Sequence, residues 1–153
     1  MRSELVIERV RRAAEAACSI EDAAADLADL IRTVSGRRWV GLYHVTTTDV
    51  VNLARSGPAP PAHPVFPANR GLTGAAIAAR AAVCSNDVAR DPRYLTNQPT
   101  TGSELIVPLM LDGNVVGTLD IEEAYPNAFT PEDQKLFEAI ARILSPLYRD
   151  VRR

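Results

Sequence analysis

Apolar residues recur at helical spacing twice near the start of the chain. Over residues 3–18, Leu5, Val6 and Val10 fall near one face of the predicted helix, and charged residues fall on the other. A second stretch, residues 19–34, repeats this spacing and ends just before a glycine. The chain therefore begins with two amphipathic helices, each with an apolar face to bury.

The pattern then changes from helical spacing to the alternation of strands. Residues 38–45 are a predicted strand with its aromatic residues, Trp39 and Tyr43, on one face and its aliphatic residues on the other. Residues 50–55 read as its hairpin partner. Residues 56–69 contain five prolines, which are incompatible with a regular helix or a central strand and predict a surface loop.

The second half of the chain contains a strong hairpin signal. After a short predicted helix at 71–81 and a brief strand at 82–86, two apolar runs flank Asp112-Gly113-Asn114 in the segment 103–121. A last helix is predicted over 130–150, where a threonine, a proline and an aspartate form a typical helix start.

These elements predict an α+β fold in one domain. Strands joined in hairpins favour an antiparallel sheet, with the terminal helices on one face and the short helix plus the proline loop on the other. We divide the domain, residues 1–153, into N-terminal helices (1–36), a sheet with a pocket (37–127) and a C-terminal helix (128–153). Together, the terminal helices offer more apolar surface than one side of a small sheet needs, which predicts a homodimer through them.

Composition narrows the possible functions. The net charge of -2 argues against a nucleic-acid partner, which requires a basic surface. Apolar runs are too short for a membrane span and the N-terminus is too charged for a signal peptide, so we expect a cytoplasmic protein. Two isolated cysteines, Cys18 and Cys84, predict neither a disulfide framework nor a metal site.

Three carboxylates on the hairpin are the main candidates for chemistry. Glu104, Asp120 and Glu122 lie at the far ends of two apolar strands, where they either stabilise the edge of the sheet or point into a pocket. A two-residue turn would place Glu104 opposite Ile121, on the other face from the remaining acids. A three-residue turn would place Glu104 opposite Glu122, so a shared acidic pocket requires a turn of odd length. Clustering would also raise the pKa of at least one of them.

Several short segments resemble the GAF domain family, and more narrowly the free methionine-(R)-sulfoxide reductases, which are GAF proteins of about this size. The segments that carry the resemblance are WVGLY at 39–43, GLTG at 71–74, NDV at 86–88, SELIVPL at 103–109 and GTLDIE at 117–122. The resemblance extends over nearly the whole chain and implies the GAF arrangement of sheet and helices.

The reductases bind their amino-acid substrate between aromatic residues and acids. By position, these correspond to Trp39, Tyr43, Glu104, Asp120 and Glu122. The same family reduces its substrate with cysteine thiolates. The positions that match those cysteines hold His63, Thr73 and Asn97 here, so the resemblance includes the binding wall but not the reaction centre.

The resulting hypothesis is a signalling sensor domain that binds a small cationic or zwitterionic metabolite. Arg70 and Thr73, at the entry to the short helix, join the aromatic and acidic residues as predicted ligand contacts, with Arg70 holding a carboxylate. No catalytic residue, cofactor or metal is assigned. Two alternatives stay open: a reductase-like enzyme that is degenerate or uses a displaced cysteine, and a dimerisation module without a ligand.

Overall fold

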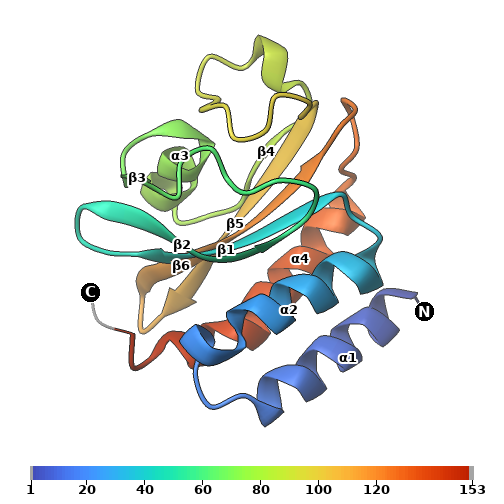
Figure 1. The fold of residues 1–153 in the computed structure, drawn as a ribbon, viewed down its shortest axis with the longest axis vertical. Coiled ribbons are helices and arrows are strands. Elements are labelled where there is room, and N and C mark those ends of the chain that lie inside the picture. Colours follow the sequence, from blue (N-terminus) through green and yellow to red (C-terminus); the bar gives the residue numbers. More distant parts are fainter. Residues whose placement is uncertain (1, 152–153) are drawn as a thin grey trace.

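The computed structural model describes residues 2–151 and contains a six-stranded antiparallel sheet with helices on both faces (Figure 1). The strands are β1 (Trp39–Val45), β2 (Asp49–Ser56), β3 (Val65–Pro67), β4 (Val83–Ser85), β5 (Ser103–Leu111) and β6 (Asn114–Glu123). They lie in the order β3-β2-β1-β6-β5-β4. The predicted α+β architecture is confirmed.

Helices from the two ends of the chain cover one face of this sheet. The helices are α1 (Arg2–Ala16), α2 (Ile20–Ser35), α3 (Gly71–Ala79) and α4 (Pro131–Leu144). α2 packs on β1 and β2, and α4 packs on β5 (Figure 1). α3 lies on the opposite face against β4 and β5, where the proline-rich segment also crosses. The pocket region is therefore separated from the terminal helices by the sheet.

Alternation along β1 divides its side chains between two cores. Val40 and Leu42 are buried with the helices α1, α2 and α4. Trp39 and Tyr43 are buried on the other face, in a smaller cluster with Val45. The faces predicted for these residues are correct, because the two-residue period of a strand determines them.

Capping groups begin and end the helices where the sequence places them. The Ser19 side chain accepts a hydrogen bond from the Asp22 amide, and Gly36 ends α2 with φ of 70°. Thr130 and Asp133 form a complete capping box at the start of α4. The final helix is shorter than predicted. α4 ends at Leu144, and the chain continues as a 3₁₀ helix, Ser145–Tyr148, which contains Pro146.

α1 differs from its prediction in one side chain. Val6, Val10 and Ala14 are buried, but Leu5, which was expected to point inward, is 69% exposed. α1 packs mainly along α2 and α4 rather than on the sheet (Figure 1). The groove between two helices receives a narrow apolar stripe, and Leu5 lies beside that stripe.

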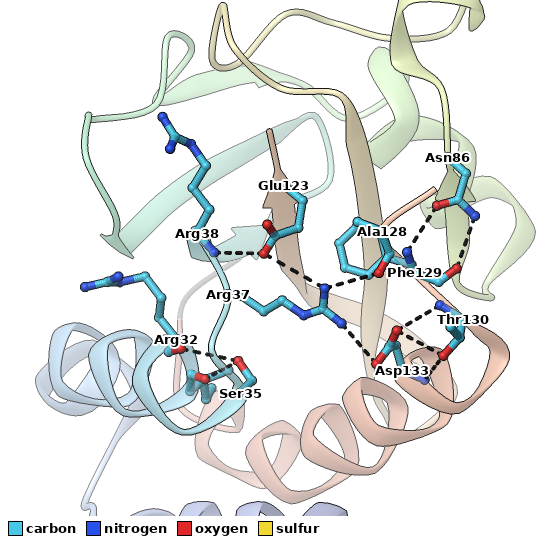
Figure 2. A network of polar contacts seen from close by, with 11 residues as sticks. Arg32, Ser35, Arg37, Arg38, Asn86, Glu123, Ala128, Phe129, Thr130 and Asp133 are labelled. Atoms are coloured by element: carbon cyan, nitrogen blue, oxygen red, sulfur yellow. Dashed lines mark hydrogen bonds and ion pairs between the residues drawn. The ribbon is translucent and has the colours of Figure 1, made fainter. Parts of the chain in front are cut away.

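A polar network holds the loop before β1 against the start of α4 (Figure 2). The Arg37 guanidinium lies 3.0 Å from an Asp133 carboxylate oxygen and 3.9 Å from a Glu123 carboxylate oxygen. It also donates to the Ala128 carbonyl at 3.3 Å and stacks on the Phe129 ring, with its central carbon 4.7 Å from the ring centre. This arginine joins the loop before β1 to the end of β6 and the start of α4, both of which are distant from it in sequence.

Among residues 2–151, none of the helices has the length and apolar character needed to cross a membrane.

Candidate functional site

The three predicted acids lie together on the face of the sheet that α3 covers. Glu104 on β5 is opposite Glu122 on β6, and Ile106 is opposite Asp120. One carboxylate oxygen from each acid lies within 4.8 Å of the others, and all three side chains are buried. We call Glu104, Asp120 and Glu122 the acid trio.

The register that unites the acid trio arises differently from the prediction. The β5–β6 turn is a two-residue turn, with φ of 51° at Asp112 and 80° at Gly113, and not the odd-length turn that a shared pocket was predicted to require. Leu109 pairs with Gly117 while Met110 pairs with Val115, so Val116 is an extra, bulged residue on β6. The bulge shifts the register by one residue and returns the acids to one face.

β1 provides the aromatic wall beside the acid trio. Trp39 pairs with Glu122, and Gly41 pairs with Asp120. A Cβ on Gly41 would lie 2.6 Å from the Trp39 ring and 2.9 Å from the Tyr43 ring, so only glycine fits between them. Trp39 donates its indole N–H to the Ala59 carbonyl at 2.9 Å and so anchors the proline-rich loop.

A small cavity lies between two members of the acid trio, α3 and the loops above, and neither Glu122 nor Trp39 lines it. Its volume is about 20 Å³, enough for about one water molecule. It is lined by Tyr43, His63, Phe66, Gly71, Leu72, Thr73, Leu95, Asn97, Glu104 and Asp120. Predicted site residues from four separate segments therefore converge on one space.

Burial makes the acid trio hard to ionise. Desolvation raises the pKa of Glu104 and of Asp120 well above their usual values, and the negative charge of the neighbouring acids raises both further. Because one carboxylate oxygen of each acid lies within 4.8 Å of the others, three negative charges side by side are disfavoured and protons are retained. Burial and the adjacent acids also raise the pKa of Tyr43, so its hydroxyl stays neutral.

Glu122 differs from its partners because two hydrogen-bond donors reach it. Asn97 donates its side-chain amide to one carboxylate oxygen, and the Thr101 hydroxyl donates to the other at 2.6 Å. Burial raises the pKa of Glu122, but these two bonds oppose that effect. Negative charge in the acid trio is therefore favoured on Glu122.

The loops over the cavity are tied to the acid trio and to each other. The Asn97 side-chain oxygen accepts a hydrogen bond from the Ala62 amide at 3.1 Å, and Gln98 donates to the Pro60 carbonyl at 2.8 Å. We call the two segments 57–66 and 91–102 the lid. Asn97 connects the lid to Glu122, so displacement of the lid must break this contact.

One carboxylate oxygen in the acid trio lacks a partner. Asp120 is 4% exposed, and within residues 2–151 its Oδ1 atom has no hydrogen-bond partner. Each such buried group costs free energy unless something compensates for it. This oxygen belongs to a residue that lines the cavity.

The remaining predicted contacts occupy different positions. Thr73 is buried and lines the cavity. Arg70 is exposed at the start of α3 and lines a separate, open hollow of about 970 Å³. Gly71 and Leu95 line both spaces, so the hollow adjoins the cavity.

Gly41, Asn97 and Thr101 are not among the ligand contacts predicted from the sequence, although the resemblance places Asn97 at the position of a family cysteine. Asn97 and Thr101 lie in an irregular segment, so no periodicity indicates where their side chains point. Gly41 carried a signal, since a glycine between two aromatic residues on a strand indicates close packing. His63, Thr73 and Asn97 all line the cavity, whereas neither Cys18 nor Cys84 does.

Comparisons with known sequences match the chain to one family. The GAF domain family model matches residues 8–146. GAF domain-containing protein A of Dictyostelium discoideum is 31% identical over 107 residues, which cover 69% of this chain and 66% of that protein. Protein YtsP of Bacillus subtilis is 29% identical over 69% of this chain and 65% of its own length. The matches thus span slightly less than two thirds of these relatives.

Solved structures with the same fold include enzymes and sensor proteins. Free methionine-R-sulfoxide reductase from Neisseria meningitidis, solved with its substrate, superposes with a TM-score of 0.88 at 26% identity, covering 95% of this chain and 87% of that one. A structure described as a GAF sensor protein from Burkholderia vietnamiensis superposes with a TM-score of 0.87 at 24% identity, covering 97% of both chains. The first of these is similar to this chain in fold and, to a limited extent, in sequence, and the second is similar in fold.

Proposed function

The chain belongs to the GAF domain family, and we propose that it is a sensor or regulatory domain that binds a small cationic or zwitterionic metabolite. The observation that carries the proposal is the buried acid trio beneath the lid, with the Asp120 Oδ1 atom unpartnered. A positively charged group would compensate all three acids at once.

An ammonium group fits the chemistry of the acid trio. It carries three N–H donors and one positive charge, and each acid offers at least one oxygen. No arginine or lysine of the described chain forms an ion pair with Glu104, Asp120 or Glu122. The charge that would balance these acids must therefore come from a ligand or from protons.

The rest of the ligand would lie towards α3. Tyr43 and Phe66, whose ring centres are 6.0 Å apart in an edge-to-face arrangement, supply an apolar wall for a short stem. Arg70 lies at the adjoining hollow, where it would bind the carboxylate of a zwitterion. Because about 20 Å³ is too small for an amino acid, binding requires the lid to move. Lid movement would transmit occupancy of the pocket to the surface.

The test is a thermal-shift screen of amino acids and small amines. Each charged contact of this kind is worth about 1–3 kcal/mol, so Glu104→Gln and Asp120→Asn should weaken binding by roughly ten- to a hundredfold. The control is Glu15→Gln, which changes an exposed acid on α1 and should bind as the wild type does. Equal binding by all four proteins would contradict the pocket and favour a dimerisation module without a ligand.

A reductase-like enzyme is the alternative from a different class, because the Neisseria meningitidis reductase shares this fold. Reduction of a sulfoxide through a disulfide requires a thiolate at the substrate. Among the described residues, no cysteine lines the cavity, and burial raises the pKa of the Cys84 thiol. Turnover of free methionine-(R)-sulfoxide with thioredoxin, abolished by Cys84→Ser, would favour the enzyme; we expect no such turnover.

A further inference from the structure

We propose that the acid trio is also a Ca²⁺ site, so that a divalent cation regulates the pocket by competing with the metabolite. The inference rests on the proposed function only for its regulatory consequence, because cation binding by the trio does not need a metabolite. Two independent observations support it: the mutual distance of the carboxylates and the unpartnered Asp120 Oδ1 atom.

The ligand set is that of a hard cation. All three groups are carboxylates, and within residues 2–151 no other group of three or more histidine, cysteine, aspartate or glutamate side chains comes together in this way. Oxygen ligands favour Ca²⁺, Mg²⁺ and Mn²⁺ over the softer metals that nitrogen and sulfur ligands bind. With both oxygens of each acid, the trio offers as many as six ligand atoms.

The spacing of the trio is compatible with Ca²⁺. Ca²⁺ binds oxygen at about 2.3–2.6 Å, so two ligands on opposite sides of the ion lie about 4.6–5.2 Å apart. Mg²⁺ binds at about 2.0–2.1 Å and reaches oxygens no more than about 4.2 Å apart. The ligand oxygens of the trio are at most 4.8 Å apart, an upper limit that lies within the span of Ca²⁺.

The size of the cavity separates a cation from a metabolite. A space of about 20 Å³ beneath the closed lid holds one small species. A single ion fits there beside Glu104 and Asp120, the two acids that line the cavity, while Asn97 and Thr101 keep their hydrogen bonds to Glu122. An amino acid fits only after the lid opens. The closed state would therefore bind Ca²⁺, and the open state would bind the metabolite.

The unpartnered oxygen is the second observation that supports a bound cation. Asp120 is 4% exposed, and its Oδ1 atom has no donor within the described chain. Since buried polar groups normally find a partner, a bound cation would satisfy this oxygen. Glu122 already accepts hydrogen bonds from Asn97 and Thr101, so the change at Asp120 is the more informative of the two.

The test titrates CaCl₂ alone into protein freed of metal with EDTA, by calorimetry and by thermal shift. MgCl₂ and NaCl at matched ionic strength serve as comparisons. The wild type should show saturable Ca²⁺ binding, with Mg²⁺ at least about tenfold weaker. Asp120→Asn and Glu104→Gln should each weaken Ca²⁺ binding at least about tenfold, because the charge of the ligands sets the affinity. Glu15→Gln should bind as the wild type does.

Three results would overturn the inference: no saturable binding to folded wild type up to about 10 mM Ca²⁺, equal affinity for Mg²⁺, or unchanged affinity in both acid variants. Circular dichroism of each variant shows whether it is folded. These measurements distinguish the cation site from the proposed function. A metabolite that binds a protein without a Ca²⁺ response supports only the proposed function, whereas a Ca²⁺ response without any metabolite supports only the cation site.

Discussion

The side chain of Asp120 illustrates how a residue can be costly to the fold and still useful to the site. It is fully enclosed, it adjoins two other acids, and one of its oxygens has no partner in the described chain. Protons offset part of the resulting repulsion, because burial raises the pKa of Asp120 and Glu104. Buried acids that bind a positive charge therefore lower the stability of the folded protein until the ligand binds.

We therefore expect the acid trio to make the protein less stable as pH rises. The carboxyls of Asp120 and Glu104 keep their protons in the folded state at a pH where the unfolded chain has already lost them. Below the unfolded pKa of about 4 this makes no difference, and above it the free energy of unfolding falls by up to about 1.4 kcal/mol per pH unit for each proton. The fall ends at the raised pKa of the folded state.

Asp120→Asn removes one of the two carboxyl groups that cause this fall in stability, because an amide does not ionise. Denaturant unfolding between pH 4 and pH 8 should show a shallower fall for this variant than for the wild type. Glu122, Tyr43 and Tyr94 face the same acids. The pKa values of both tyrosines are raised, that of Tyr94 to about 12, so neither tyrosine titrates in this range. Glu122 and His63 are present in both the wild type and the variant, so they do not explain a difference between the two curves. Parallel curves for the two proteins would contradict the prediction, and Asp26→Asn, on an exposed face of α2, is the control.

At the scale of elements, one bulged residue determines the site. Without Val116 as an extra residue, the two-residue turn would put Glu104 opposite Ile121, and the trio would be split between two faces. Leu119 and Ile121 face the helices only in the observed register, so the register that buries the core also unites the acids. The loop before β1 is a second irregular element, and Arg37 holds it against the start of α4.

Replacement of Arg37 should be strongly destabilising. Arg37→Leu leaves the Glu123 carboxylate, which is 6% exposed, without its ion pair, and it removes the partner of Asp133 (Figure 2). Loss of one partner from a buried pair costs about 3–5 kcal/mol. Urea unfolding measures this loss. Arg12→Leu, which breaks an exposed pair with Glu8, is the matched control and should cost less than about 1 kcal/mol. Similar losses in the two variants would show that Arg37 is not a structural anchor.

At the scale of the whole molecule, the terminal helices bury most of their apolar surface against other parts of the chain. Val6, Val10 and Ala14 of α1 are buried against α2 and α4, which uses part of the surplus that predicted a dimer. What stays exposed is Leu5, together with a groove of about 350 Å³ between α1 and α4 that Ile143 and Leu147 line. This smaller surface is where we expect two copies to meet.

The expected assembly is a homodimer through α1 and α4. Sedimentation at tens of micromolar protein should show dimers, and Leu147→Glu should shift them towards monomers by placing a charge in the groove. Thr33→Glu, on an exposed position of α2, is the control. A wild type that sediments only as a monomer at this concentration would rule out the dimer.

Most of the fold follows from local patterns in the chain. Helical spacing, capping residues and strand alternation are local properties, so they located the helices and strands and the faces of Trp39 and Tyr43. They also identified Glu104, Asp120 and Glu122 as acids in unusual positions. Each of these conclusions depends on residues within a few positions of one another.

Other features arise only when distant segments pack. The Val116 bulge depends on how both faces of β5 and β6 fit their neighbours, which no turn motif encodes. Asn97 and Thr101 reach Glu122 because an irregular loop folds back over the sheet. Arg70 lies outside the cavity that Thr73 lines, although only two residues separate them. Local patterns set the direction of side chains on regular elements, but loops and register are decided by long-range packing, whose free energy is shared among many residues.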